Sequence, residues 1–182
     1  YTWIRYRCGA RTLIQIKLQA GARRYLVARI NPNHIKCTKL AMPQSSIFAD
    51  ELGPAKIIQV CEPSLGLNAT LVVDNVARGP AIGGMRIASD VTTEECLRLA
   101  RAMTLKNAAS GLAHGGGKSV LVGDPHMPRT QKEQLIRAFA YALRHEHDYI
   151  FGPDMGTDET CMAWVHDEIG RAVGHPPELG GI

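Results

Sequence analysis

Several features are scarce or missing in this 182-residue sequence, and each absence excludes a class of function. The five cysteines are scattered and form no Cys-x-x-Cys pair, so neither a disulfide framework nor a zinc site is indicated. No apolar run approaches the ~20 residues that a membrane-spanning helix needs. The seven histidines show no metal-ligand spacing. We therefore expect a cytoplasmic, metal-free protein that does not bind a membrane.

Acidic residues are absent from the first 49 positions, which carry nine of the 21 basic residues. A basic arm of this kind is typical of nucleic-acid contact or of a targeting peptide, although this one lacks the serine content of a transit peptide. The first plausible start is Met42. We therefore interpret residues 1–41 as a basic segment that is non-native or unstructured and contacts no nucleic acid. Residues 42–182 then form the functional domain.

Hydrophobic periodicity and turn residues divide the chain from residue 47 onwards into alternating helices and strands. Strands are predicted at 57–61, 70–76, 119–122 and 149–151, with a further strand beginning or ending within 85–88. Helices are predicted at 47–54 and after three N-terminal caps: Thr92 with Glu95, Thr130 with Glu133, and Thr157. Glycines are expected to form compact turns at 79–84 and 115–117 and to end helices at Gly111 and Gly174. This alternation predicts an α/β fold with helices on both faces of the sheet.

Two lysines stand out by their local context. Lys106 lies near the end of a predicted helix, and Lys118 follows a run of three glycines. Two ammonium groups that converge on one cleft repel each other, which favours loss of a proton from one of them. That lysine could act as a general base while its partner binds an anion. The alternative is that both are solvated surface lysines.

The sequence around Lys118 also invites comparison with a phosphate-binding loop, but the spacing is wrong. The first glycine of that motif would fall on Leu112, and the predicted order is helix, loop, strand rather than strand, loop, helix. No Gly-x-Gly-x-x-Gly fingerprint for a dinucleotide occurs either. Asp154 follows a predicted strand, where ligands of α/β proteins gather, and could relay protons beside a lysine. Its alternative role is that of an ordinary turn aspartate.

Four blocks in order resemble the N-terminal substrate-binding and dimerisation domain of the glutamate/leucine/phenylalanine/valine dehydrogenases. They are 79–86 (GPAIGGMR), 97–109 (LRLARAMTLKNAA), 115–118 (GGGK) and 152–158 (GPDMGTD). The resemblance covers about 47–182 and implies a three-layer αβα domain with a mixed sheet. It also implies that the family's dinucleotide-binding Rossmann domain follows Ile182 and is absent from this chain, which alone should be inactive.

The implied reaction is NAD(P)-dependent oxidative deamination of an L-amino acid to a 2-oxo acid and ammonium, carried out by a homo-oligomer. By the resemblance, Lys118 matches the lysine that activates water, Asp154 the proton shuttle, and Lys106 the lysine that binds the substrate α-carboxylate. The positions that match the lining of the substrate pocket are Ile82, Gly83, Gly84, Met103 and Gly152.

One departure bears on specificity. Glutamate-specific members carry a lysine immediately before the Gly-Gly pair, and here that position is Ile82. A buried carboxylate without a partner would be costly against isoleucine, so an aliphatic, leucine-like substrate is favoured over glutamate. The alternatives left open are a glutamate dehydrogenase and a non-catalytic oligomerisation module of the same fold. The sequence does not discriminate NAD from NADP, nor does it give the size of the oligomer.

Overall fold

The computed structural model describes residues 2–8, 12–18 and 49–180. Within the basic N-terminal segment, the strands β1 (Thr2–Cys8) and β2 (Thr12–Leu18) pair antiparallel as a sheet of their own. The proposed domain start at Met42 and the first residues of the predicted 47–54 helix lie outside the described residues. Whether residues 1–41 belong to the functional domain therefore stays a prediction.

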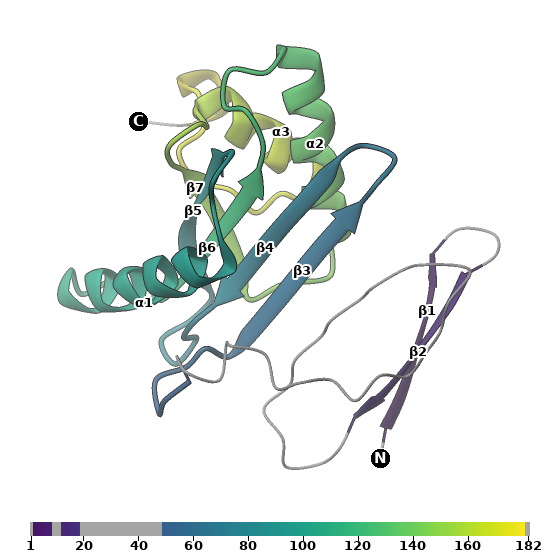
Figure 1. The fold of residues 1–182 in the computed structure, drawn as a ribbon. Coiled ribbons are helices and arrows are strands. Elements are labelled where there is room, and N and C mark those ends of the chain that lie inside the picture. Colours follow the sequence, from purple (N-terminus) through teal and green to yellow (C-terminus); the bar gives the residue numbers. More distant parts are fainter. Residues whose placement is uncertain (1, 9–11, 19–48, 181–182) are drawn as a thin grey trace.

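The main body is built on a five-stranded sheet with the order β3-β4-β6-β5-β7 (Figure 1). Neighbouring strands are antiparallel from β3 through β4 to β6, whereas β5 runs parallel to both β6 and β7. The strands are β3 (Lys56–Glu62), β4 (Leu67–Val73), β5 (Ala81–Ala88), β6 (Gly115–Val122) and β7 (Tyr149–Pro153). The helices are α1 (Thr93–Ala109), α2 (Arg129–Ala142) and α3 (Glu159–Ile169), followed by a short 3-10 turn at Pro177–Leu179.

Helices cover both faces of this sheet. Successive strand residues point to opposite faces, so each face presents its own apolar side chains to the helices that cover it. On one face α1 packs through Leu97 and Ala100 against Val72 and Val120. On the other face α2 and α3 enclose a larger core that includes Leu71, Met85, Phe139, Phe151 and Met162. The predicted three-layer αβα fold with a mixed sheet is therefore confirmed.

The predicted N-terminal cap of α1 is confirmed, since the Thr92 side chain accepts a hydrogen bond from the Glu95 backbone N–H. The cap predicted at Thr130 is wrong. Helix α2 already begins at Arg129, and its N-cap is Pro128, which makes no side-chain capping bond. Gly111 has a φ of +68° just beyond α1, as expected of a residue that ends a helix.

The predicted limits of α3 are shifted at both ends. Its N-cap is Asp158 rather than Thr157, because the Thr157 hydroxyl is engaged elsewhere, with the Met85 carbonyl and the Asp154 backbone N–H. Its C-terminus is Gly170, with a φ of +66°, rather than Gly174. The predicted 47–54 helix is also wrong over residues 49–54. There the Asp50 side chain accepts hydrogen bonds from the backbone N–H groups of Leu52 and Gly53, which is a turn geometry.

Most residues of the two glycine-rich turns predicted from the sequence belong to strands, whereas Gly79 and Pro80 form a bend before β5, where Gly79 has a φ of +131°. Gly83 and Gly84 belong to β5, and 115–117 begin β6. These glycines allow close approach of other backbone segments. A Cβ on Gly83 would lie 1.9 Å from the Gly117 carbonyl oxygen, and one on Gly115 would lie 1.7 Å from the Asn75 carbonyl oxygen. The missing side chains therefore permit tight packing within the sheet rather than a loop that holds a ligand.

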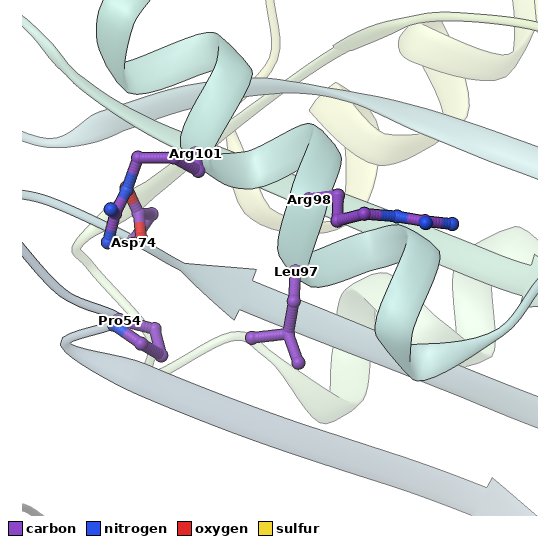
Figure 2. Close-up of a pocket in the computed structure, with 5 residues that line it drawn as sticks. All are labelled: Pro54, Asp74, Leu97, Arg98 and Arg101. Carbon is purple, nitrogen blue, oxygen red and sulfur yellow. Dashed lines mark hydrogen bonds and ion pairs between the residues drawn. The ribbon is translucent and has the colours of Figure 1, made fainter. Parts of the chain in front are cut away.

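Arg101 joins α1 to two acidic residues that come before and after the β3–β4 hairpin. It donates from Nε to Asp74 at 2.8 Å and from Nη1 to Asp50 at 2.6 Å. Asp74 is only 2% exposed and also accepts a hydrogen bond from Thr104 at 2.6 Å. Figure 2 shows Arg101 turned toward Asp74 beside a pocket, whereas the Arg98 side chain on the same helix points away from Asp74.

We expect Arg101→Met to lower the free energy of unfolding by ~3 kcal/mol, because it leaves the buried Asp74 carboxylate without its cation. Arg98→Met is the matched control. Its side chain is 62% exposed and lies 3.8 Å from Glu94, so the change should be within ~0.5 kcal/mol. Urea unfolding of both variants measures the difference, and equal losses would contradict a stabilising role for Arg101.

Candidate active site

The predicted site residues on the strands gather mainly on the α1 face of β5, β6 and β7. Along β5, Ala81, Met85 and Ile87 enter the core beneath α2 and α3, so the residues between them face α1. The same alternation applies to β6 and β7, where Leu121 and Phe151 enter that core. The positions that share the α1 face are Ile82, Gly84, Arg86, Gly116, Lys118, Val120, Ile150 and Gly152.

Lys118 and Asp154 form an ion pair at the centre of this face, between Lys118 Nζ and Asp154 Oδ2. Lys118 is only 5% exposed, so it is not a solvated surface lysine. Asp154 directly follows β7, whose register pairs Gly152 with Gly84. A Cβ on Gly84 would lie 2.8 Å from Asp154 Cβ and 3.2 Å from Lys118 Nζ. The absence of a side chain at Gly84 therefore leaves room for the ion pair beside β5.

Arg86 is a further member of the site that the sequence analysis did not single out. Its Nε donates to Asp154 Oδ2 at 3.2 Å, and its Nη1 donates to Glu95 Oε1 at 2.5 Å. Burial alone would raise the pKa of Asp154. Hydrogen bonds and positive charge from Lys118 and Arg86, together with the Met155 backbone N–H, outweigh burial and lower that pKa below its usual value. The carboxylate is therefore held in its ionised form.

The two predicted site residues on α1 lie in its second half. The Met103 backbone lies against β6, since a Cβ on Gly116 would be 2.5 Å from the Met103 carbonyl carbon. Lys106 is in the last turn of the helix and is exposed. Asn107, which the sequence analysis did not use, is 3% exposed and donates to the Gly115 carbonyl at 2.7 Å. This hydrogen bond fixes the turn that carries Lys106 against the start of β6.

Unlike the other predicted strand residues of the site, Gly83 belongs to the side of the sheet that α2 and α3 cover. Its carbonyl accepts a hydrogen bond from the Tyr149 hydroxyl at 2.8 Å, within the layer that packs under α2 and α3. That hydroxyl also lies 3.3 Å from Ser119 Oγ. Complete burial raises the pKa of Tyr149, so the phenol stays protonated and acts as a hydrogen-bond donor. The buried Tyr149 thus supports the β5 backbone at Gly83 from the side opposite Lys118.

The glycine run of 115–117 does not offer bare backbone to the pyrophosphate of a nicotinamide dinucleotide. The space beside Gly116 is filled by the backbone of Thr104, whose nitrogen would lie 2.0 Å from a Cβ on Gly116. Among residues 2–8, 12–18 and 49–180, no group of three or more His, Cys, Asp or Glu side chains is placed to hold a metal ion. Nor is any helix in these ranges long and apolar enough to cross a membrane.

Comparison with known proteins identifies the class to which this fold and site belong. The sequence model of a family described as the Glu/Leu/Phe/Val dehydrogenase dimerisation domain matches residues 54–171. The chain therefore belongs to the glutamate/leucine/phenylalanine/valine dehydrogenase family, as its four sequence blocks predict. The fold corresponds to the N-terminal part of these enzymes, and their C-terminal Rossmann domain is not covered.

Individual relatives share this part of the chain. Leucine dehydrogenase of Bacillus subtilis (strain 168) is 40% identical over 120 residues, which are 63% of this chain and 32% of that protein. The NADP(+)-dependent glutamate dehydrogenase of Pyrobaculum calidifontis is 38% identical over 148 residues, covering 70% of this chain and 35% of that protein. A crystal structure of hetero-hexameric glutamate dehydrogenase from Thermus thermophilus, in a Leu-bound form, matches with 30% identity and a TM-score of 0.65. That match covers 71% of this chain and 36% of the Thermus chain. The chain thus spans about a third of the length of the relatives it matches.

Proposed function

We propose that this chain is the substrate-binding domain of an NAD(P)-dependent L-amino acid dehydrogenase that interconverts an amino acid with its 2-oxo acid and ammonium. The observation that carries the proposal is the buried Lys118–Asp154 pair on a face of the sheet where Gly84 and Gly152 provide no side chain. The overall reaction releases one ammonium ion for each water consumed. It therefore needs groups that move protons at the substrate nitrogen and at the attacking water.

Lys118 and Asp154 have different proposed roles. Lys118 activates the water that attacks the imino carbon, and Asp154 exchanges protons with the amino nitrogen. Asp154 suits this role because it is ionised and partly buried, with a side chain 21% exposed. Lys106, exposed in the last turn of α1, binds the substrate α-carboxylate. Met103, Ile82, Gly84 and Gly152 line the substrate, and Gly83 holds the β5 backbone in place behind them.

The coenzyme, NAD or NADP, supplies the oxidising power and is bound mainly by the C-terminal domain of the family rather than by residues described here. Since the family model is that of a dimerisation domain, we also propose that the protein is a homo-oligomer. The direct test is to assay the complete gene product for reduction of NAD and NADP with leucine, valine, phenylalanine and glutamate. No reduction with any of these amino acids would overturn the proposal.

Ile82 is proposed to select an aliphatic substrate side chain. It lies two residues before Gly84 on the same face of β5 and is half-buried, so it can contact a side chain that extends from the Lys118–Asp154 pair. A carboxylate in that position would lose its hydration without gaining a cation.

We expect Ile82→Lys to change the ratio of kcat/KM for leucine over glutamate by ~10²-fold or more toward glutamate, since a new ion pair replaces an apolar contact. Ile82→Leu is the matched control and should leave the ratio nearly unchanged. Steady-state kinetics of both variants of the complete enzyme measure the effect. A lysine variant with the wild-type ratio would show that position 82 does not contact the substrate side chain.

A further inference from the structure

Arg86 connects the proposed proton shuttle to the first turn of α1. Its side chain is 18% exposed and lies between two carboxylates, with Nε 3.2 Å from Asp154 Oδ2 and Nη1 2.5 Å from Glu95 Oε1. Glu95 is itself fixed, because its backbone N–H is bonded to the Thr92 cap. A planar guanidinium held at both ends in this way has little freedom to move.

Arg86 and Lys118 donate to the same oxygen of Asp154, Oδ2. This shared acceptor matters because the two cations differ in chemistry. Arginine remains charged at any pH that a folded protein meets, whereas a buried lysine can give up its proton. If Lys118 loses a proton during the reaction, Arg86 still provides one positive charge and one hydrogen bond to the carboxylate.

We propose that Arg86 is a positioning residue for Asp154, anchored by Glu95, which keeps the carboxylate in place and ionised whichever protonation state Lys118 adopts. The inference rests on the proposed function, in which Lys118 acts on water while Asp154 accepts a proton from the substrate nitrogen. Without Arg86, deprotonation of Lys118 would leave a partly buried carboxylate with no cation, and Asp154 would take up a proton itself. The two residues would then no longer act independently.

Other titratable groups surround this cluster, but none of them can replace Arg86. Tyr149 lies behind β5 with its phenol protonated, and burial raises the pKa of the Cys96 thiol on α1 to about 12. Glu95 carries a negative charge, so it acts on Asp154 only by holding Arg86. Within the described part of the chain, the cations that pair with Asp154 are therefore Lys118 and Arg86.

The test measures the titration of the Asp154 carboxyl carbon by NMR in this chain, in a background where Lys118 has been removed. In Lys118→Met, we expect the pKa of Asp154 to remain at or below its usual value, because Arg86 is still present. In Lys118→Met with Arg86→Met, we expect that pKa to rise by at least ~1 pH unit, as for a carboxyl that loses a nearby cation. Arg86→Gln keeps a hydrogen-bond donor without the charge. It should give a similar rise and serves if the methionine variant does not fold.

Arg137→Met in the same background is the matched control, because Arg137 pairs with Glu133, Asp167 and Glu168 on α2 and α3 at the opposite face. It should leave the titration of Asp154 unchanged. An Asp154 pKa that is the same with and without Arg86 would overturn the inference. The measurement needs no turnover, so an inactive complete protein would refute the proposed function without affecting this result. An Asp154 pKa that does not depend on Arg86 would refute the inference without affecting the proposed function.

Discussion

Replacing Lys118 with alanine is expected to lower kcat/KM of the complete dehydrogenase by ~10³-fold or more, within the range that general acid–base groups contribute. The substitution removes the group proposed to activate water. It also removes one of the two cations that hold Asp154, so the proton shuttle loses a partner at the same time. The measurement is steady-state reduction of NAD(P) by leucine, with the fold of the variant checked by its unfolding curve.

A further variant separates the proton transfer proposed for Lys118 from its charge, and a second variant serves as a control. Lys118→Arg keeps a cation beside Asp154 but cannot lose its proton, so we expect it to be almost as inactive as the alanine variant. Lys56→Ala is the control for removal of a paired lysine, since Lys56 bonds Glu146 and Asp148 rather than Asp154. It should keep near-normal turnover. Full activity in Lys118→Ala would remove the basis of the proposed function, and full activity in Lys118→Arg would restrict Lys118 to an electrostatic role.

The layered fold could be predicted from the sequence because its signals are local. A capping residue such as Thr92 acts within one helical turn, and the β-branched runs at 57–61 and 119–122 identify strands without reference to their neighbours. The limits of α3 were predicted less well, because Thr157 and Asp158 are both acceptable caps. The choice between them depends on Met85, which is distant in sequence and engages the Thr157 hydroxyl.

The site was predicted unevenly for a similar reason. The resemblance named Lys118 and Asp154, and the structure brings these two into contact. Arg86 stood in one of the same sequence blocks, two residues after Gly84, and strand alternation alone would have placed it on the same face. What the sequence could not supply is the partner of Arg86 on the covering helix, because Glu95 meets Arg86 only once α1 has packed on β5.

The glycine run before Lys118 was assigned the wrong structure from the sequence. Three consecutive glycines were interpreted as a compact loop, since glycine is typical of turns and of backbone near ligands. Glycine is equally suited to a strand that another backbone segment approaches closely. The sequence does not discriminate between these uses, because the segment that approaches Gly116 is α1, whose position depends on the whole sheet.

Gly116→Ala is accordingly expected to cause a large loss of stability. A Cβ there would lie 2.0 Å from the Thr104 backbone nitrogen and 2.5 Å from the Met103 carbonyl carbon. These are backbone atoms of α1, so relief requires movement of the helix, which Ala100 and Asn107 hold against the sheet. We expect the free energy of unfolding to fall by at least ~3 kcal/mol, or roughly 6–12 °C in Tm for a domain of this size.

Gly152→Ala is the matched control, because its Cβ would meet only Val173 Cγ2 at 3.6 Å and the Gly83 carbonyl oxygen at 3.7 Å, both ordinary contacts. It should change the free energy of unfolding by no more than ~0.5 kcal/mol. Thermal and urea unfolding of the two variants give the comparison directly. Similar losses at both positions would mean that the cost is a general property of alanine in these strands. A large loss at Gly116 alone would show that close packing of α1 on β6 requires glycine.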